Sequence, residues 1–212
     1  MECLKNSAEN IGKAVEVLKK GGVIVHPADT CFGLAGDLMK EDALRKLQEI
    51  KGRDAQKPMS IMLPPHFKPL LGEFTVLNDF SEMACEKLFP GPVTIVLPKG
   101  PRIPPYFFPD VSTIGIRMPY VTNQYDIMLK YYHPLITTSA NLSDQPVCTT
   151  CADVIKIFEG SKHQPDLLLD GEIQGNGMPS TVISLEGNQV KILREGPLGK
   201  RQLETILGLN IN

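Results

Sequence analysis

The stretch SAENIGKAVEVLKKGGVIVHP, residues 7–27, contains the two kinds of element from which the rest of the chain is built. Its first part predicts a helix over residues 7–20, because Ser7 can cap the start and apolar residues recur on one face, namely Ile11, Ala14, Val15 and Leu18. A pair of glycines then ends the helix, and the apolar run after them predicts a strand over 23–26 that Pro27 closes.

The same alternation of helix-like and strand-like stretches continues to the C-terminus. Further helices are predicted at 41–50, 79–89, 123–132, 151–159 and 200–207. Further strands are predicted at 58–63, 92–97, 112–118, 134–139, 166–170, 180–185 and 189–194. Strands such as Thr94–Leu97 are apolar on both faces, which suits the middle of a covered sheet. We therefore expect an α/β fold, in the broad sense that includes mixed α+β, in a single domain over residues 1–212.

Composition and charge narrow the class of protein. The chain has 212 residues, of which 42% are hydrophobic and 22% charged, so it can bury a sizeable core. A net charge of −2 disfavours adhesion to nucleic acid or membrane through bulk positive charge. No apolar run is long enough to span a membrane, and the first residues lack the pattern of a signal peptide. With five scattered cysteines, we expect a reduced, cytoplasmic protein.

The familiar catalytic motifs are absent from the sequence. No phosphate-binding loop, dinucleotide fingerprint, nucleophile elbow or zinc-protease motif occurs. The four histidines (His26, His66, His133 and His163) are not at metal-ligand spacing, and we interpret each as a surface or packing residue. The prolines of Pro98–Asp110 predict a stiffened surface loop or a lid.

Cys148 and Cys151 form the one recognisable metal or redox spacing. Zinc needs four ligands, and no matching second pair exists. A redox role is open, because Thr150 and Asp153 predict a capping box and a helix N-terminus lowers a thiol pKa. The favoured interpretation is two incidental cysteines at the start of a helix.

Positive charge is concentrated in three segments. Residues 51–57, 99–117 and 191–201 carry net charges of +2, +2 and +3, although the whole chain has −2. Several of these cations stand beside Gly or Pro, where a rigid guanidinium suits phosphate oxygens, but solvated loop charges would give the same pattern. Ser139 and Asn141 follow a predicted strand, and Asp29 and Thr30 follow another. Such positions bind ligands in open α/β sheets, although turn chemistry alone also favours these residues.

Seven segments in order resemble the YrdC-domain family, and together they cover about residues 10–197. They are 21–34 (GGVIVHPADTCFGL), 49–53 (EIKGR) with 57–60 (KPMS), 90–94 (PGPVT), 113–119 (TIGIRMP), 138–146 (TSANLSDQP), 180–183 (STVI) and 192–196 (ILREG). The resemblance implies a twisted mixed sheet folded around a large, open, cationic cavity. Characterised members of the family include threonylcarbamoyl-AMP synthases.

The resemblance implies a reaction in which L-threonine, bicarbonate and ATP give threonylcarbamoyl-AMP and pyrophosphate. The product feeds a transferase complex that modifies adenosine 37 of tRNA. Mg²⁺ would be the cofactor, bridging ATP phosphates without a protein metal motif. Such chemistry needs positioning and charge neutralisation more than a protein nucleophile, which agrees with the missing motifs.

The family motifs also imply roles for individual residues. Lys51 and Arg53 are the expected catalytic residues. Threonine would be bound by Thr30, Met62, Arg117, Thr137 and Ser180, with Arg117 on the carboxylate. ATP would be bound by Arg53, Lys57, Thr113, Ser139, Asn141, Val147 and Arg194.

Four positions depart from the family pattern: Ala28, Asp54, Met62 and Val147. Ala28 lacks a hydroxyl that is usual there, and Asp54 adds a negative charge to the expected phosphate clamp. Two alternative functions stand beside the synthase. One is a YciO-like relative of different activity, which tends to lose the Lys-Gly-Arg and Ser-Ala-Asn signatures kept here. The other is an RNA-binding or ribosome-associated factor, which the low aromatic content disfavours.

Overall fold

The computed structural model describes residues 1–52, 58–120, 123–143 and 145–211. Its helices are α1 (Ala8–Lys19), α2 (Glu41–Lys51), α3 (Leu71–Phe74), α4 (Asp79–Leu88), α5 (Asn123–Tyr131), α6 (Cys151–Phe158) and α7 (Lys200–Leu207), with a 3₁₀ turn η1 (Pro65–Leu70). Its strands are β1 (Glu2–Lys5), β2 (Ile24–His26), β3 (Gly33–Asp37), β4 (Ser60–Met62), β5 (Val93–Pro98), β6 (Thr113–Arg117), β7 (Leu135–Ser139), β8 (Leu167–Asp170), β9 (Thr181–Glu186) and β10 (Gln189–Arg194).

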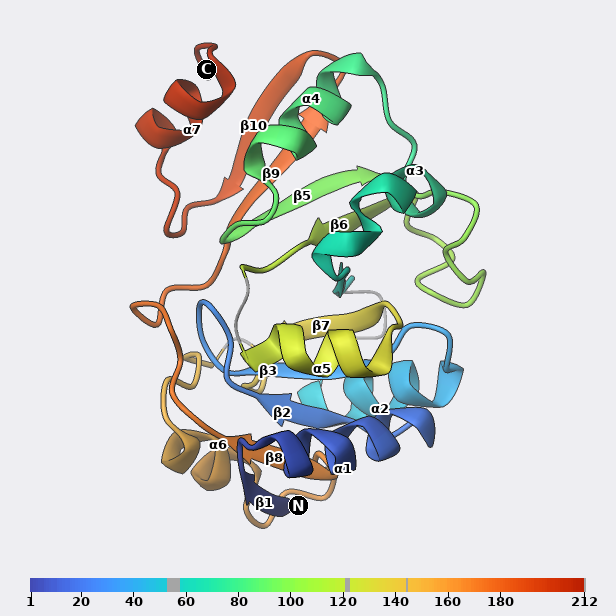
Figure 1. Ribbon diagram of the computed structural model, residues 1–212, viewed down its shortest axis with the longest axis vertical. Helices are drawn as coiled ribbons and strands as arrows, with labels where there is room; N and C mark the ends of the chain where they lie inside the picture. The colour runs from blue at the N-terminus through green and yellow to red at the C-terminus, as the bar shows by residue number, and fades with distance from the viewer. Residues whose placement is uncertain (53–57, 121–122, 144, 212) are drawn as a thin grey trace.

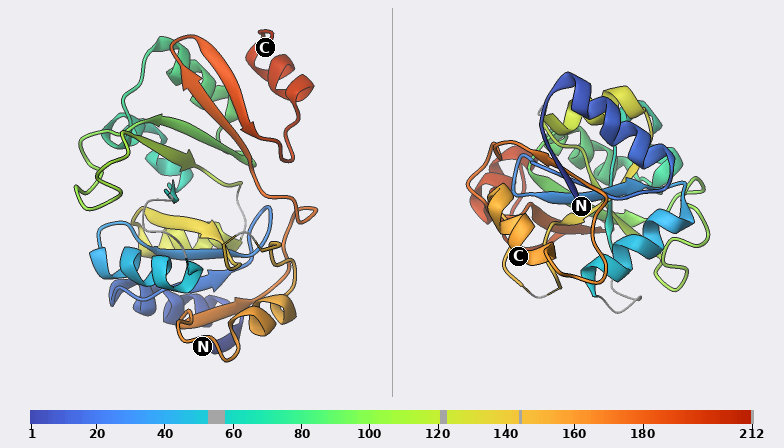
Figure 2. Two further views of the ribbon diagram at one scale, coloured as in Figure 1. Left: turned by 180° about the vertical axis from the view of Figure 1, so that it is seen from behind. Right: turned by 90° about the horizontal axis from the view of Figure 1, so that it is seen from below.

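The strands form one mixed sheet in the order β1-β8-β2-β3-β7-β4-β6-β5-β9-β10. Figure 1 shows two groups within it: β1, β8, β2, β3 and β7 with α1, α2, α5 and α6 below, and β6, β5, β9 and β10 with α3, α4 and α7 above. Short β4 joins the groups, because it pairs antiparallel with β7 and parallel with β6. The view from behind shows the same division, with the two termini at opposite ends of the molecule (Figure 2). The expected α/β fold with a large mixed sheet is confirmed.

Local sequence signals account for most element boundaries. Ser7 accepts a hydrogen bond from the Asn10 backbone and caps α1, whose buried face consists of the four predicted residues. Asn78 with Ser81 and Thr150 with Asp153 form capping boxes at α4 and α6. Every helix and strand predicted above is present, with ends that differ by two residues or fewer.

Strand β3 was not predicted, although it lies in the middle of the lower group. Its sequence, GLAGD, has low strand propensity, yet all five residues are buried. Gly36 allows close packing on α2, since a Cβ there would lie 3.0 Å from the Cβ of Ala43, a tighter contact than side chains usually make. Pairing with β2 on one side and β7 on the other stabilises the strand. The residues of β3 themselves contain no pattern that predicts either pairing. Strand β1, η1 and α3 were also not predicted.

The proline-rich segment 98–110 is a packed loop. Ile103, Phe107 and Phe108 are buried in the main core, and the Lys99 ammonium donates to the Phe107 and Phe108 carbonyls at 2.6 and 2.7 Å. The Tyr106 hydroxyl donates to the Leu38 carbonyl at 2.8 Å. No residue of this loop lines the cavity described below, so the packing favours the stiffened-loop interpretation over the lid. None of the helices in the described ranges is both long and apolar enough to cross a membrane.

Candidate active site: a cationic cavity

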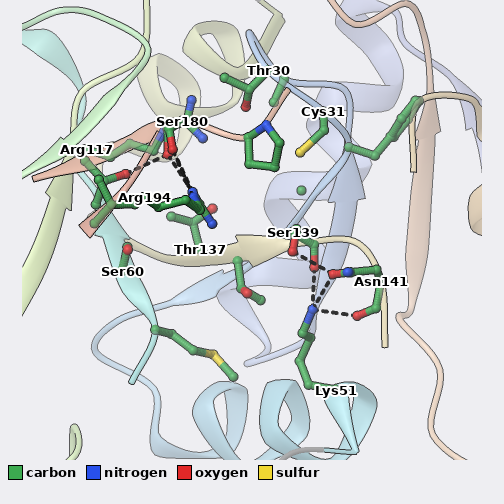
Figure 3. A pocket seen from close by; sticks show the side chains of 18 of the residues that line it. Thr30, Cys31, Lys51, Ser60, Arg117, Thr137, Ser139, Asn141, Ser180 and Arg194 are labelled. Atoms are coloured by element: carbon green, nitrogen blue, oxygen red, sulfur yellow. Dashed lines mark hydrogen bonds between the residues drawn. The ribbon is translucent and has the colours of Figure 1, made fainter. Parts of the chain in front are cut away.

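A cavity of about 220 Å³ lies where strand ends of the two groups meet (Figure 3). Its wall comes from the end of β2 and the loop after it, the last turn of α2, and strands β4 to β7, β9 and β10. Eight of the predicted site residues line it: Thr30, Lys51, Arg117, Thr137, Ser139, Asn141, Ser180 and Arg194. Segments spread over most of the chain thus contribute to one site.

The cavity is positively charged. Lys51, Arg117 and Arg194 line it, and no Asp or Glu is found among the described lining residues. Three cations without lining carboxylates favour an anionic ligand, such as a carboxylate or a phosphate.

Arg117 is fixed by an ion pair from outside the lining. Its Nη2 donates to Oδ1 of Asp29, and the Arg117 and Asp29 side chains are only 11% and 5% exposed. Among the described residues, neither Arg117 Nε nor Asp29 Oδ2 has a hydrogen-bond partner, although both atoms are buried. Arg117 is therefore oriented by one carboxylate while part of its donor fork lacks an acceptor.

Arg194 is held by Ser180, the residue directly before β9. Its Nε and Nη2 donate to the Ser180 carbonyl at 3.2 and 2.7 Å, and Nη2 also lies 3.3 Å from Ser180 Oγ. The Ser180 hydroxyl shares a 2.9 Å hydrogen bond with the Thr94 hydroxyl on β5. Burial lowers the pKa of the Arg194 guanidinium, and the like charge of Arg117 adds to the effect. An anion between the two guanidinium groups would relieve that repulsion.

Lys51 ties the end of α2 to the turn after β7. Its ammonium donates to the Ser139 carbonyl at 2.9 Å, and to the carbonyl and side-chain oxygens of Asn141 at 2.5 and 2.6 Å. Ser139 Oγ also donates to Asn141 Oδ1 at 2.6 Å, and the Asn141 amide donates to the Gln145 carbonyl. The buried Lys51 ammonium thus stabilises the turn that contains Ser139 and Asn141, two predicted nucleotide-binding residues.

His26 and Cys31 line the cavity but were missed as site residues. The His26 ring lies 3.2 Å from the Pro27 carbonyl through Nδ1, which makes Nδ1 the donor, and burial lowers its pKa to about 4. Its Nε2 is therefore an acceptor, and it is buried without a partner among the described residues. Burial raises the pKa of the Cys31 thiol even though Arg117 opposes the shift. The interpretation of His26 as an ordinary surface or packing residue is thus incomplete.

Other lining residues lie in the family segments but were not singled out as site residues. Ser60 ends the segment 57–60, Thr94 ends the segment 90–94, and Ser143 lies in the turn after Asn141. The Ser143 hydroxyl is likewise buried without a partner among the described residues. The one sequence signal near His26 was Ala28, two residues later, where the chain departs from the family pattern.

Three predicted site residues of the described ranges are not brought into this cavity. Met62 is buried among the apolar residues that pack against α1 and α5, while Thr113 and Val147 stand outside the lining. Arg53 and Lys57, like Asp54, lie outside the described residues. No cluster of three or more potential metal ligands occurs within the described ranges.

Comparison with known proteins gives a consistent relationship. The Sua5/YciO/YrdC family model, described as "Telomere recombination", matches residues 16–196. The chain is 30% identical over 199 residues to the threonylcarbamoyl-AMP synthase of Pyrococcus abyssi, covering 92% of this chain and 56% of that protein. It is 33% identical over 197 residues to the putative threonylcarbamoyl-AMP synthase of Methanocaldococcus jannaschii, covering 90% and 89%. The chain thus spans little more than half the length of the Pyrococcus relative.

Solved structures agree with the sequence comparison. P. abyssi Sua5 complexed with L-threonine superposes with a TM-score of 0.87 at 27% identity, over all of this chain and 62% of that one. E. coli YciO superposes with a TM-score of 0.77 at 22% identity, over 92% of this chain and 94% of that one, a likeness that shows the fold alone. With a family model that matches most of its length, the chain belongs to the Sua5/YciO/YrdC family.

Proposed function

We propose that this protein is a threonylcarbamoyl-AMP synthase, a nucleotidyltransferase that converts L-threonine, bicarbonate and ATP into threonylcarbamoyl-AMP and pyrophosphate. The observation that carries the proposal is the cavity, which three cations line with no carboxylate among its described residues. All three substrates and both of these products carry negative groups that this lining neutralises. The names of the relatives in P. abyssi and M. jannaschii support the same assignment.

Arg117 is the proposed anchor of the threonine carboxylate. Asp29 already fixes the guanidinium, so binding a carboxylate costs little side-chain ordering. The unpartnered Nε supplies a donor for it. Thr30, Thr137 and Ser180 place hydroxyl groups in the same wall, where one of them could partner the substrate hydroxyl. An unmet polar partner in such a site discriminates strongly against analogues that lack the hydroxyl.

The charge of the cavity also favours the first chemical step. An α-ammonium group cannot attack bicarbonate or carbon dioxide until it loses a proton. Lys51, Arg117 and Arg194 disfavour a further positive charge, so the cavity lowers the pKa of a bound ammonium. The free amine then forms the carbamate, with loss of water from bicarbonate or of a proton after attack on carbon dioxide. The carbamate oxygen attacks the α-phosphorus of ATP as pyrophosphate leaves.

ATP is the proposed partner of the remaining cations. Arg194 lies at the end of β10, lines the cavity together with Arg117, and has a partly desolvated guanidinium that is suited to phosphate oxygens. Arg53 and Lys57 are further predicted ligands of ATP. Ser139 and Asn141 would lie against the nucleotide, on the turn that Lys51 holds. The catalytic contribution of these groups is positioning and charge neutralisation.

Magnesium is proposed to arrive with ATP. The described lining residues offer hydroxyl and amide oxygens but no carboxylate, so they do not form a protein cage for the ion. The labile product would pass to a transferase complex that modifies tRNA, and the proposed place of action is the cytoplasm.

Pyrophosphate release tests the function directly. Purified protein with ATP, magnesium, bicarbonate and L-threonine is expected to release pyrophosphate, and omission of threonine is expected to abolish the release. Threonylcarbamoyl-AMP should be detected by mass spectrometry in the complete mixture. Release that is equal without threonine, or absent throughout, would contradict the proposal.

A matched pair of variants ties the activity to the cavity. Arg194→Gln removes a lining charge, and Arg45→Gln removes an exposed charge on α2 that pairs with Asp42. We expect the first change to reduce pyrophosphate release at least tenfold, the scale of a charge-assisted hydrogen bond, and the second to leave it unchanged. Equal effects would place the activity outside this cavity.

A further inference from the structure

The structure gives Cys151 a different partner from the one its sequence spacing suggests. Cys148, three residues away, is fully buried in the main core, and burial raises its pKa to about 12. The Cys151 sulfur instead lies 3.8 Å from the sulfur of Cys3, which is 148 positions away in the chain. Two sulfur atoms at that separation are in van der Waals contact.

The fold itself brings these two residues together. Strand β1 pairs in parallel with β8 at the edge of the sheet, with Cys3 opposite Leu168. Helix α6, which begins at Cys151, covers the same edge, and β1, β8 and α6 lie together at the lower end of the molecule in Figure 1. Cys3 is exposed and Cys151 is partly exposed, beside a surface hollow that Lys5, Asp170 and Glu172 help to line. A small reagent in solution can therefore reach the pair.

We propose that Cys3 and Cys151 form a dithiol site that low-molecular-weight disulfides, such as oxidised glutathione, oxidise to an intramolecular disulfide. The thiolate of one cysteine attacks the glutathione disulfide, which forms a protein–glutathione mixed disulfide and releases one glutathione thiolate. The second cysteine loses its proton to solvent and attacks the protein sulfur of the mixed disulfide, which releases the second glutathione. Two protein thiols are oxidised and one disulfide is reduced to two thiols, so the electrons balance.

Exposure decides the order of attack. Cys3 is the exposed member and is the first nucleophile. Burial raises the pKa of Cys151 to about 12, with the Cys3 thiol and Asp170 adding to the shift, so Cys151 acts second. The expectation that the helix N-terminus would lower this thiol pKa is therefore wrong, because desolvation and the neighbouring groups outweigh it. Conversion of the Cys3 thiol into a mixed disulfide removes one of the groups that raise the pKa of Cys151.

The disulfide would connect two distant parts of the chain. It would join β1 to the first residue of α6, directly after the segment that carries Asn141 and Ser143 into the cavity wall. The Phe32 amide already holds that segment through the Cys148 carbonyl at 3.0 Å. Neither Cys3 nor Cys151 lines the cavity, so we expect oxidation to stabilise the fold with the cavity intact.

The test is oxidation of the whole protein with oxidised glutathione, followed by thiol titration and a non-reducing peptide map. The wild type is expected to lose two thiols and to yield one cross-linked peptide pair that contains Cys3 and Cys151. The melting temperature should rise by roughly 5–10 °C and return to its starting value with dithiothreitol. Cys3→Ser and Cys151→Ser should give no cross-link and no reversible rise, and at most one glutathione adduct.

Cys148→Ala is the matched control, since it removes the partner that the sequence spacing suggests. This variant should still form the Cys3–Cys151 link, and melting of each variant in reducing buffer checks that it has folded. Cys3→Ala replaces Cys3→Ser if the latter does not fold. A Cys148–Cys151 link, glutathione adducts on Cys3 and Cys151 without a cross-link, or five unchanged thiols would each overturn the proposal.

Discussion

Arg117 shows how much a single residue depends on its neighbour. An arginine at the end of a strand could be a solvated charge, but Asp29 binds it from the loop after β2 and holds it in the cavity wall. A buried guanidinium with only part of its fork satisfied is a binding group with a defined direction. The role of Arg117 in threonine binding therefore depends on planar geometry as well as on charge.

Arg117→Lys tests that distinction. Lysine keeps a positive charge opposite Asp29 but lacks the planar fork, so the KM for threonine should rise roughly 10- to 100-fold, equivalent to about 1.5–3 kcal/mol. The KM for ATP should change far less. Arg102→Lys is the control, because Arg102 forms an exposed ion pair with Glu73 away from the cavity. A parallel rise in both KM values would argue against a carboxylate role.

His26 makes a prediction about pH. Its pKa is about 4 in the folded protein, because burial disfavours the imidazolium, against 6.5 in the unfolded chain. Between those values the unfolded chain binds the extra proton, so the free energy of unfolding must fall as the pH is lowered from 6.5 to 4. The linked loss is about 3 kcal/mol in total. Urea unfolding at a series of pH values should show that His26→Phe removes this part of the slope, and an unchanged slope would refute the assignment.

At the scale of elements, the hairpin of β9 and β10 places Ser180 and Arg194 together. The chain leaves β10 so close to the start of β9 that a Cβ on Gly196 would lie 2.3 Å from the Thr181 nitrogen and 2.5 Å from the Pro179 carbonyl oxygen. These atoms flank Ser180, whose carbonyl accepts both hydrogen bonds from Arg194. Close backbone contact at Gly196 is therefore part of how the site is built.

Gly196→Ala should push these segments apart. We expect a loss of about 1–3 kcal/mol in the free energy of unfolding and weaker ATP binding, measured by urea denaturation and calorimetry. Gly72→Ala is the matched control, since a Cβ there meets no atom within 4 Å and the residue lies in α3. Equal stability of the Gly196 variant and the wild type would show that the backbone can move without cost.

The turn after β7 depends on a side chain from another element. The Lys51 ammonium satisfies three oxygens of Ser139 and Asn141, so Lys51→Met would leave buried acceptors without that donor. The expected loss is about 1–3 kcal/mol of stability, together with weaker nucleotide binding. Lys68→Met is a suitable comparison, because Lys68 makes one exposed hydrogen bond to Glu86. Full stability in the Lys51 variant would mean that water replaces the ammonium.

At the scale of the whole molecule, the net charge of the chain is negative, whereas the charge of the cavity lining is positive. The chain has a net charge of −2, yet three cations line one cavity. We expect millimolar pyrophosphate to raise the melting temperature at low ionic strength. The rise should become smaller as salt is added towards about 1 M, because the Debye screening length falls to about 3 Å. Arg194→Gln should reduce the rise, whereas Arg45→Gln should not. A salt-independent rise would indicate binding that does not rely on these charges.

Much of this architecture could be predicted because helices and amphipathic strands carry their own signals. The predicted elements all occur, and their ends follow caps such as Ser7 and Asn78. Strand β3 could not be predicted, since its glycine- and alanine-rich sequence becomes a strand only between β2 and β7.

The candidate site could likewise be predicted only in part from the sequence. The family motifs predicted roles for eight lining residues, whereas Ser60, Thr94 and Cys31 lie in the same segments without a predicted role and are assigned to the cavity only by the structure.

The amino-acid sequence alone determined the element pattern, the fold class and the set of polar segments that belong to the site. Those properties depend on periodicity, capping and motif spacing, which involve residues close together in the sequence. Only the tertiary structure decided the partners: Asp29 for Arg117, Ser180 for Arg194, Asn141 for Lys51 and Cys3 for Cys151. Each of these pairs joins residues 14 to 148 positions apart, and such contacts arise from strand order and packing, which no local pattern specifies.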